Sequence, residues 1–367
     1  MKVAIVCDWL TNVGGAEKVL LAVHQMYPKA PIYTSKYDPR GIDWFKDADV
    51  RTGWLQIFPT KLRRLLSPLR QSYFNHLDLS DYDLIISVTG AEAKSIKKGD
   101  AIHICYCHVP TQYYWQMYDS YLAHPGFNPV LDPIVRFFFK LFVRPLRRAD
   151  YKAAQRPDYF VTISNYAAEQ IAKYYKRSSV VIAPCVETAK FTNQQPVTAK
   201  RTGFINYSRQ VSWKRQDLAI KACLAANLPL TLIGDGPEHQ NLVAAAQHSP
   251  LITFLPPMKT EELLTELNKA EGFIFPSVEP FGIAPVEALA SGCPVIALHE
   301  GGALDYIQDG KNGVLFQKQT VKSLQEALVR FRKLKFDSKT VAKSAQAFDV
   351  AEFKRKLQEF IDEKMAD

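Results

Sequence analysis

The sequence predicts an α/β protein with two doubly wound, Rossmann-like domains. Three observations support this fold class. The chain has 367 residues, more than one ordinary hydrophobic core accommodates. Short apolar runs alternate with helix-like stretches, as they do in parallel sheets covered by helices on both faces. This alternation occurs twice, before and after a polar, glutamine-rich stretch over residues 192–201.

The first series of strands starts at the N-terminus. Its apolar runs are short and separated by helical stretches, which is typical of buried parallel strands. A helix is expected to open at Gly14–Lys18, directly after the first run. The expected strands are Val3–Cys7, Pro31–Thr34, Tyr82–Val88, Ile102–His108 and Tyr159–Ser164. We therefore expect a first domain over residues 1–190.

The second series follows the polar stretch and predicts a second domain over residues 201–345. Its expected strands are Gly203–Tyr207, Leu230–Gly234, Ile252–Leu255, Gly272–Phe275 and Val295–Ala297. Ligands of open parallel sheets bind at the carboxyl ends of the strands. The loops that follow these strands are therefore the places to look for chemistry.

Composition narrows the class of protein. Apolar residues make up 47% of the chain and aromatic residues 12%, which excludes a disordered chain. The excess of 46 Lys and Arg over 37 Asp and Glu gives a net charge of +9 and a pI near 9.1. Such a balance favours anionic partners, namely nucleic acid, phosphorylated substrates or an acidic membrane surface.

Cysteine usage and the N-terminus indicate a cytosolic location. The six cysteines lie mostly in apolar runs and form no CxxC pair, so buried reduced thiols are expected. The run Met1–Cys7 is too short, and too soon followed by Asp8, for a signal peptide. No apolar run approaches the ~20 residues that span a bilayer. We expect a soluble or peripheral protein on the cytosolic side of the membrane.

The most informative motif places Glu279 and Glu287 on either side of a strand-to-helix turn. Pro285 suits the first turn of the following helix, where its missing N–H costs nothing. The free N–H groups at this helix start make an anion site. They belong to Phe281, Gly282, Ile283 and Ala284. An anion on these amides and hydroxyls on the two carboxylates would together suit a nucleotide-sugar.

This stretch resembles the E-x7-E signature of the retaining glycosyltransferases of family 4. The likeness continues through Ser291–Ile296, Gly301-Gly302 and Asp309–Gly313, and near the start through Cys7–Leu10 and Gly14–Lys18. The resemblance implies the GT-B fold, in which two Rossmann-like domains face each other across a cleft. It also implies that the final helix, over residues 351–367, crosses back to the first domain.

The resemblance assigns roles to individual residues. Arg209 and Lys214 match cations that neutralise the departing diphosphate, while Glu279 matches a ligand of the sugar hydroxyls. Glu287 matches a ligand of the ribose hydroxyls, and His108 matches a histidine beside the reacting carbon of the donor sugar. Gly14 and Gly15 permit close approach of backbone to an anion.

Each assignment has a structural alternative. Arg209 and Lys214 could be two solvated loop cations, because basic surface residues are common. His108 could have a purely structural role at the end of its strand. The Gly14-Gly15 pair could only make a turn, and no Gly-x-Gly-x-x-Gly fingerprint of a dinucleotide site accompanies it.

Residues 132–156 mix aromatic and basic side chains. Phenylalanines alternate there with cations, which favours a helix lying in an anionic lipid interface. The candidate membrane or acceptor contacts are Arg136, Lys140, Arg144, Arg147 and Arg148. A second basic segment carries Lys61, Arg63, Arg64 and Arg70. The alternative is a core-facing helix with a solvated basic side.

The resemblance implies a glycosyltransferase that moves a sugar, mannose from GDP-mannose being the leading choice, onto a hydroxyl of a glycan or lipid-linked acceptor. No Asp-x-Asp signature for a divalent ion is present, so we expect no metal and no cofactor. A UDP- or ADP-sugar is the alternative donor. Rival functions are a phosphorylase-like enzyme, for which no pyridoxal phosphate motif is present, a nucleic-acid-binding protein and a catalytically inactive scaffold.

Overall fold

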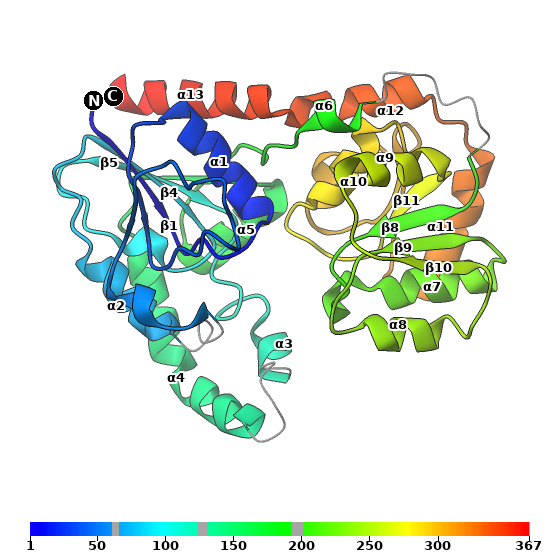
Figure 1. Ribbon diagram of the computed structural model, residues 1–367, viewed down its shortest axis with the longest axis horizontal. Helices are drawn as coiled ribbons and strands as arrows, with labels where there is room; N and C mark the ends of the chain where they lie inside the picture. Colours follow the sequence, from blue (N-terminus) through cyan, green and yellow to red (C-terminus); the bar gives the residue numbers. More distant parts are fainter. Residues whose placement is uncertain (61–65, 124–130, 193–200, 367) are drawn as a thin grey trace. The chain divides into compact units, whose positions relative to one another are not determined.

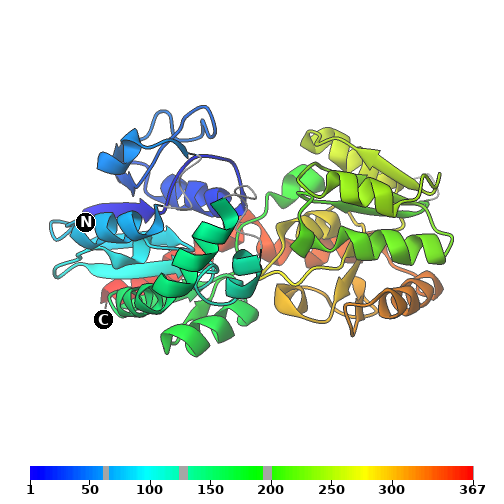
Figure 2. The ribbon, with the colours of Figure 1, turned by 90° about the horizontal axis from the view of Figure 1, so that it is seen from below.

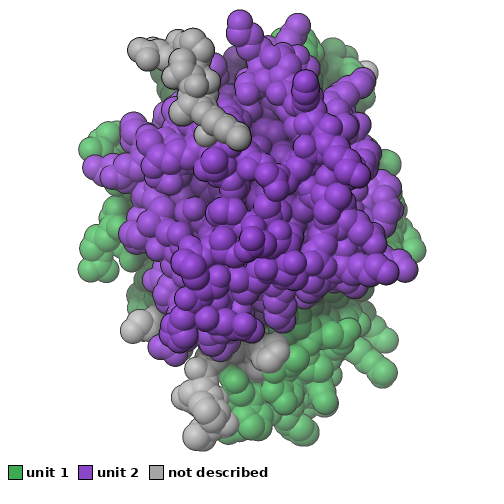
Figure 3. Space-filling model, turned by 90° about the vertical axis from the view of Figure 1, so that its right-hand side faces the viewer, with its two compact units in different colours: residues 1–184, 354–367 green, residues 185–353 purple. Residues whose placement is uncertain are grey.

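The computed structural model describes residues 1–60, 66–123, 131–192 and 201–366. Most of the predicted linker, and the basic residues Lys61, Arg63 and Arg64, lie outside these ranges. The described chain forms two compact units, coloured separately in Figure 3. Unit 1 consists of Met1–Pro184 and Lys354–Asp367, and unit 2 of Cys185–Phe353. Each unit has its own sheet with helices packed on it (Figures 1 and 2).

Unit 1 contains a parallel sheet of seven strands in the order β3-β2-β1-β4-β5-β6-β7. The strands are β1 Val3–Cys7, β2 Ile32–Thr34, β3 Val50–Thr52, β4 Leu84–Thr89, β5 Ile102–Cys107, β6 Tyr159–Thr162 and β7 Val180–Val181. The strand order reverses between β1 and β4, which is the switch point where doubly wound sheets bind ligands. Asp8 follows β1 at this point and accepts hydrogen bonds from the Thr89 hydroxyl and the Gly90 amide.

The helices of unit 1 include the C-terminal end of the chain. They are α1 Gly15–Met26, η1 Trp54–Ile57, α2 Ser67–His76, η3 Ala93–Ser95, α3 Tyr118–Ala123, α4 Leu131–Ala153, α5 Asn165–Tyr175 and most of α13 Val350–Ala366. Helix α13 buries Leu357 and Ile361. The Tyr27 hydroxyl donates to the Gln358 side chain at 3.1 Å, and so joins α13 to the end of α1.

Unit 2 contains a parallel sheet of six strands in the order β10-β9-β8-β11-β12-β13. The strands are β8 Phe204–Tyr207, β9 Leu230–Ile233, β10 Ile252–Leu255, β11 Gly272–Phe275, β12 Val295–Leu298 and β13 Gly313–Phe316. Strands β8 and β11 pair side by side and run in parallel, so the loops after them are neighbours. These are the loops that carry Arg209, Lys214 and Glu279.

Helices cover both faces of this second sheet. Figure 1 shows α9 and α10 on one face and α7 and α8 on the other. The unit contains α6 Thr188–Phe191, η4 Ser212–Lys214, α7 Gln216–Ala225, α8 His239–Ala245, α9 Thr260–Lys269, α10 Ile283–Ala290, η5 Gly301–Asp305, α11 Val321–Lys333, α12 Ser338–Ser344 and η6 Gln346–Phe348. A continuous apolar core joins α7 and α11 to the sheet through residues such as Ile220, Ile274 and Leu328.

The predicted fold class is confirmed, and every predicted strand is present within one or two residues of its expected bounds. The sequence analysis missed three strands. The edge strand β3 is largely exposed and lacks an apolar run, and β7 has two residues. The third, β13, has the apolar sequence Gly313–Phe316 and buries Val314 and Phe316 in the core of unit 2, so its signal was present in the sequence.

Candidate functional site

The turn between β11 and α10 is held in place by glycines. Gly282 precedes α10 with φ +91°, and a Cβ there would come within 2.7 Å of the Phe275 ring. A Cβ on Gly302 would lie 2.3 Å from the Pro280 carbonyl oxygen. Only residues without side chains fit at both positions. The backbone of η5 can therefore lie directly on the turn that carries Glu279.

The start of α10 offers unpaired amides. Because the helix begins at Ile283, the N–H groups of its first residues have no acceptor within the helix. Ile283 and Ala284 are partly exposed, whereas Pro285 is buried and has no N–H to lose. The Phe281 side chain is buried, and its carbonyl accepts a hydrogen bond from the Tyr306 hydroxyl at 2.8 Å. Phe281 thus helps to hold the turn before α10, and the anion site predicted there stays a prediction.

The two predicted carboxylates have different environments. Glu279 Oε1 accepts from Lys214 Nζ at 2.6 Å and from the Ser277 hydroxyl at 2.8 Å. Glu287 is buried, and its Oε2 accepts from the Tyr207 hydroxyl at 2.9 Å. Burial first, and then the Glu287 carboxylate, raises the pKa of Tyr207 well above its usual value, so Tyr207 remains a neutral donor.

The loop after β8 is fixed by the loop after β9. A Cβ on Gly234 would lie 2.3 Å from the Ser208 carbonyl oxygen, and one on Gly236 would lie 2.2 Å from the Gln210 carbonyl oxygen. The buried Gln210 side chain also donates to the Gly234 carbonyl at 3.0 Å. Arg209 lies on this loop and is exposed, and its side chain has no hydrogen-bond or ion-pair partner among the residues that the structure describes.

Three of the residues predicted to contact the sugar donor belong to unit 1. Gly14 and Gly15 lie at the start of α1, where the Glu17 carboxylate approaches to within 2.8 Å of a Cβ built on Gly14. His108 directly follows β5, and its amide donates to the Thr89 carbonyl at 2.9 Å. Burial lowers the pKa of His108 to about 4, so its imidazole is neutral near pH 7. The roles predicted for these three residues stay predictions.

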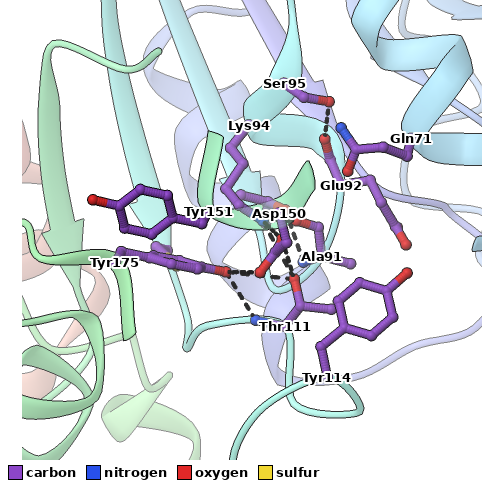
Figure 4. Close-up of polar contacts among 12 residues, drawn as sticks. Gln71, Ala91, Glu92, Lys94, Ser95, Thr111, Tyr114, Asp150, Tyr151 and Tyr175 are labelled. Carbon is purple, nitrogen blue, oxygen red and sulfur yellow. Dashed lines mark hydrogen bonds and ion pairs between the residues drawn. The ribbon is translucent and has the colours of Figure 1, made fainter. Parts of the chain in front are cut away.

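Asp150 is the centre of a buried polar network in unit 1 (Figure 4). Its carboxylate accepts hydrogen bonds from Lys94 Nζ at 2.6 Å, Trp115 Nε1 at 2.6 Å, and the Thr111 and Tyr175 hydroxyls at 2.8 Å each. Burial by itself lowers the pKa of Lys94, but the charge and hydrogen bond of Asp150, together with Tyr175 and Cys107, hold that pKa well above its usual value. The network joins the end of α4 to the core of the unit.

A small cleft in unit 1 lies beyond the ends of β1 and β2. Its lining includes Trp9, Lys36, Leu55, Leu66 and Arg70. The Arg70 guanidinium contacts the Trp9 ring at 4.9 Å and pairs with the buried Glu92 carboxylate at 3.0 Å. Lys36 Nζ donates to the carbonyls that end η1. The lining of the cleft therefore combines two held cations and the Trp9 ring with apolar residues such as Leu55 and Leu66.

Helix α4 has apolar side chains on two sides. One side packs on the protein through the buried Val143 and through Phe139, whose ring lies 5.3 Å from that of Tyr118. The other side is exposed to solvent, and its apolar residues are Leu131, Ile134, Phe137, Phe138, Leu141 and Phe142. The apolar residues of this helix therefore do not all face a core, contrary to the alternative considered above.

The five predicted cations of α4 divide into two groups. Lys140, Arg144 and Arg148 are exposed. Arg147 instead donates to the Tyr114 carbonyl and contacts the Tyr118 ring at 4.8 Å, and Arg136 donates to the Ala123 carbonyl at 2.9 Å. The sequence pattern did not separate the two groups, because both lie at helical spacing along one basic flank.

The described ranges contain neither a helix that is long and apolar enough to cross a membrane nor a group of three His, Cys, Asp or Glu side chains suited to a metal ion. The predicted independence from metal stays a prediction. All six cysteines are buried, and none of them forms a disulfide in the described part of the chain.

The β8 and β11 loops lie within the part of the chain that matches a known family. Residues 187–348 match the family described as Glycosyl transferases group 1. This segment is a group 1 glycosyl transferase domain. It comprises nearly all of unit 2, including Arg209, Lys214, Glu279 and Glu287.

Two relatives of the glycosyl transferase domain illustrate the range of the family. The D-inositol 3-phosphate glycosyltransferase of Mycobacterium sp. strain JLS is 30% identical over 195 residues, which cover 47% of this chain and 44% of that protein. A GDP-mannose-dependent alpha-(1-6)-phosphatidylinositol monomannoside mannosyltransferase of Mycolicibacterium smegmatis is 27% identical over 201 residues, 47% of this chain and 52% of the relative. The chain thus spans about half the length of the curated relatives it matches.

Solved structures extend the likeness to the fold of the whole chain. The lipopolysaccharide outer core galactosyltransferase WaaB in its apo form matches 99% of this chain and 100% of its own, with a TM-score of 0.71 and 17% identity. Anabaena HepE in complex with UDP-glucose gives a TM-score of 0.68 and 19% identity, with 99% and 100% covered. At such identities the likeness concerns the fold alone, and that fold is GT-B.

The sequence analysis missed several residues that hold the site together. Tyr207 and Ser277 position the two carboxylates, and Tyr306 supports the turn between them. Tyr207 and Ser277 lie at or just beyond the ends of β8 and β11, a position that could have marked them as candidates. The buried pairing of Lys94 with Asp150 has no such signal, because the two residues are distant in sequence.

Proposed function

We propose that this protein is a retaining glycosyltransferase that moves a hexose from a nucleotide-sugar to a hydroxyl of a lipid-linked or glycan acceptor. The proposal rests above all on the meeting of Lys214 and Glu279 beside the start of α10. A cation and free amides suit the diphosphate of a nucleotide-sugar, and an adjacent carboxylate suits sugar hydroxyls. Membership of unit 2 in the group 1 family supports this interpretation.

In the proposed reaction, the acceptor hydroxyl oxygen bonds to the anomeric carbon as the bond between that carbon and the phosphate oxygen breaks. Negative charge builds on the leaving diphosphate, which takes up the hydroxyl proton. Arg209, Lys214 and the amides of Ile283 and Ala284 stabilise that charge more in the transition state than in the ground state. Removing one such donor typically costs about 3–4 kcal/mol of transition-state stabilisation. These cations occupy the role that a divalent ion has in other transferases, so we propose that no metal is required.

Glu279 holds sugar hydroxyls in this proposal and does not attack the anomeric carbon. Glu287, held by Tyr207, binds the ribose hydroxyls. Retention is tested by NMR of the product. The product should carry the same anomeric configuration as the donor, and an inverted product would contradict this part of the proposal.

GDP-mannose is the proposed donor, and a UDP- or ADP-hexose is the alternative. A GDP-mannose-dependent relative supports the first choice, and the complex of a GT-B neighbour with UDP-glucose supports the second. A thermal-shift panel of GDP, UDP, ADP and their sugars tests both. A ligand that binds the folded protein raises its stability by RT ln(1 + [L]/Kd). We expect GDP and GDP-mannose to give the largest rise, and no rise with any nucleotide would contradict the function.

We also propose that the exposed side of α4 lies on an anionic membrane surface, where a lipid-linked acceptor would be found. This side combines exposed phenylalanines with the exposed cations Lys140, Arg144 and Arg148. Apolar side chains can enter the acyl boundary while neighbouring cations meet anionic headgroups. A location on the inner face of the cell membrane would follow.

A further inference from the structure

The carboxylate proposed to bind the sugar and a cation proposed to bind the diphosphate are paired with each other in the structure. Lys214 Nζ lies 2.6 Å from Glu279 Oε1, and the two side chains are only 21% and 17% exposed. The Ser277 hydroxyl donates to the same oxygen at 2.8 Å. Ser277 is itself buried, so Glu279 is held where it can keep Lys214.

Arg209 provides an internal contrast. It is the other cation assigned to the diphosphate, and it is exposed with no ion-pair partner in the described part of the chain. A diphosphate that binds this site can contact the Arg209 guanidinium without breaking an ion pair. To contact Lys214, it must break the ion pair between Lys214 and Glu279. The two cations therefore differ in what must be broken before they bind phosphate.

We propose that Glu279 competes with the diphosphate for Lys214, and that this competition lets the site favour the intact sugar-nucleotide over the nucleoside diphosphate product. When the diphosphate of an intact sugar-nucleotide binds Lys214, the hydroxyls of its sugar bind Glu279 in place of Lys214. A nucleoside diphosphate takes Lys214 and leaves the Glu279 carboxylate without a cation or a hydroxyl. The product is therefore bound less tightly, and its release is favoured. This inference rests on the proposed donor site.

A double-mutant cycle distinguishes competition for Lys214 from a general electrostatic repulsion between the Glu279 carboxylate and a bound anion. The proteins are wild type, Glu279→Gln, Lys214→Met and the double variant. The ligands are GDP and UDP, measured by isothermal titration calorimetry. Glutamine keeps the size of Glu279, and methionine keeps much of the aliphatic stem of Lys214. We expect Glu279→Gln to tighten binding of the nucleoside diphosphate about tenfold in the presence of Lys214. In the Lys214→Met background we expect no gain.

The matched control is Arg209→Met. It should weaken nucleoside diphosphate binding by the same factor in the wild type and in the Glu279→Gln background, because Arg209 has no contact with Glu279. The inference would be overturned if Glu279→Gln raised the affinity for the nucleoside diphosphate equally in the wild-type and Lys214→Met backgrounds. It would also be overturned if the affinity rose in neither background. If none of the nucleotides of the thermal-shift panel binds the wild type, the proposed function itself fails. Binding without coupling between Lys214 and Glu279 contradicts this inference alone.

Discussion

At the scale of single residues, the site depends on side chains that hold other side chains. Tyr207 donates to Glu287, and Ser277 donates to Glu279. A buried carboxylate that loses its hydrogen-bond donor is poorly positioned, and its charge is costly to keep in the protein interior. In the proposed reaction, Tyr207 and Ser277 do not contact the nucleotide-sugar, but they fix the carboxylates that bind it.

Replacing Tyr207 by Phe tests this positioning. The variant removes the hydroxyl that donates to Glu287, and a hydrogen bond of this kind contributes about 1 kcal/mol, or about fivefold in affinity. We expect binding of the nucleoside diphosphate, measured by calorimetry, to weaken by about that factor. Binding of inorganic pyrophosphate, which has no ribose, should not change. An equal loss for pyrophosphate would show that Tyr207 acts on the whole site.

The buried histidines of unit 1 predict a dependence of stability on pH. Burial lowers the pKa of His103 to about 3 and that of His108 to about 4, against 6.5 in the unfolded chain. The unfolded chain therefore binds more protons below pH 6.5, and the free energy of unfolding falls as the pH drops from 6.5 towards 4. Each histidine should cost about 2 kcal/mol at pH 5 relative to pH 7.

Denaturant unfolding at pH 7 and pH 5 measures this loss. His103→Gln should reduce the loss in free energy of unfolding between pH 7 and pH 5 by about 2 kcal/mol, the contribution of one histidine. The exposed His76, replaced by Gln, is the control and should leave the loss unchanged. A His103→Gln protein that loses as much stability as the wild type would contradict the assignment of a neutral buried histidine.

At the scale of elements, α4 is fixed at one end and exposed along much of its length. Asp150, near the end of the helix, accepts four hydrogen bonds in the core of unit 1. Toward its start, Phe137, Phe138 and Leu141 are exposed. The helix is thus held by a polar network and leaves an apolar side free for another surface.

Replacing Asp150 by Ala should destabilise unit 1 strongly. The change leaves Lys94 buried without its counter-charge, which typically costs about 3–5 kcal/mol. Equilibrium denaturation measures the loss in free energy of unfolding. Asp119→Ala, an exposed carboxylate on α3, should change stability by less than about 0.5 kcal/mol. If the two variants were equally stable, the buried network would not be what anchors α4.

The exposed side of α4 predicts binding to anionic vesicles. The protein should sediment with vesicles that contain anionic lipid but not with neutral vesicles, and high salt should weaken the binding. Phe138→Ser with Phe142→Ser should reduce binding, because each ring is 50% exposed in the apolar stripe. Val329→Ser, on α11 of unit 2 and 55% exposed, is the matched control. Equal binding to both vesicle types would remove the electrostatic argument.

At the scale of the whole molecule, the sequence predicts the fold class because apolar periodicity reports buried strands directly. Two of the strands that it missed, β3 and β7, are short or exposed and contribute little to any core. The turn at Glu279 could be predicted because glycine adopts turn conformations closed to other residues, and proline fixes the φ that the first turn of a helix needs. The pairing of Lys214 with Glu279 could not be predicted, since it depends on the close approach of two loops in the folded sheet.

The most direct test of the account is a crystal structure of the protein with the nucleotide-sugar that the thermal-shift panel selects. The account predicts density for the diphosphate in contact with Arg209, Lys214 and the amides of Ile283 and Ala284. Glu279 should then hold sugar hydroxyls in place of Lys214. A diphosphate bound elsewhere on the protein, or Lys214 still paired with Glu279 beside a bound donor, would contradict the central claim.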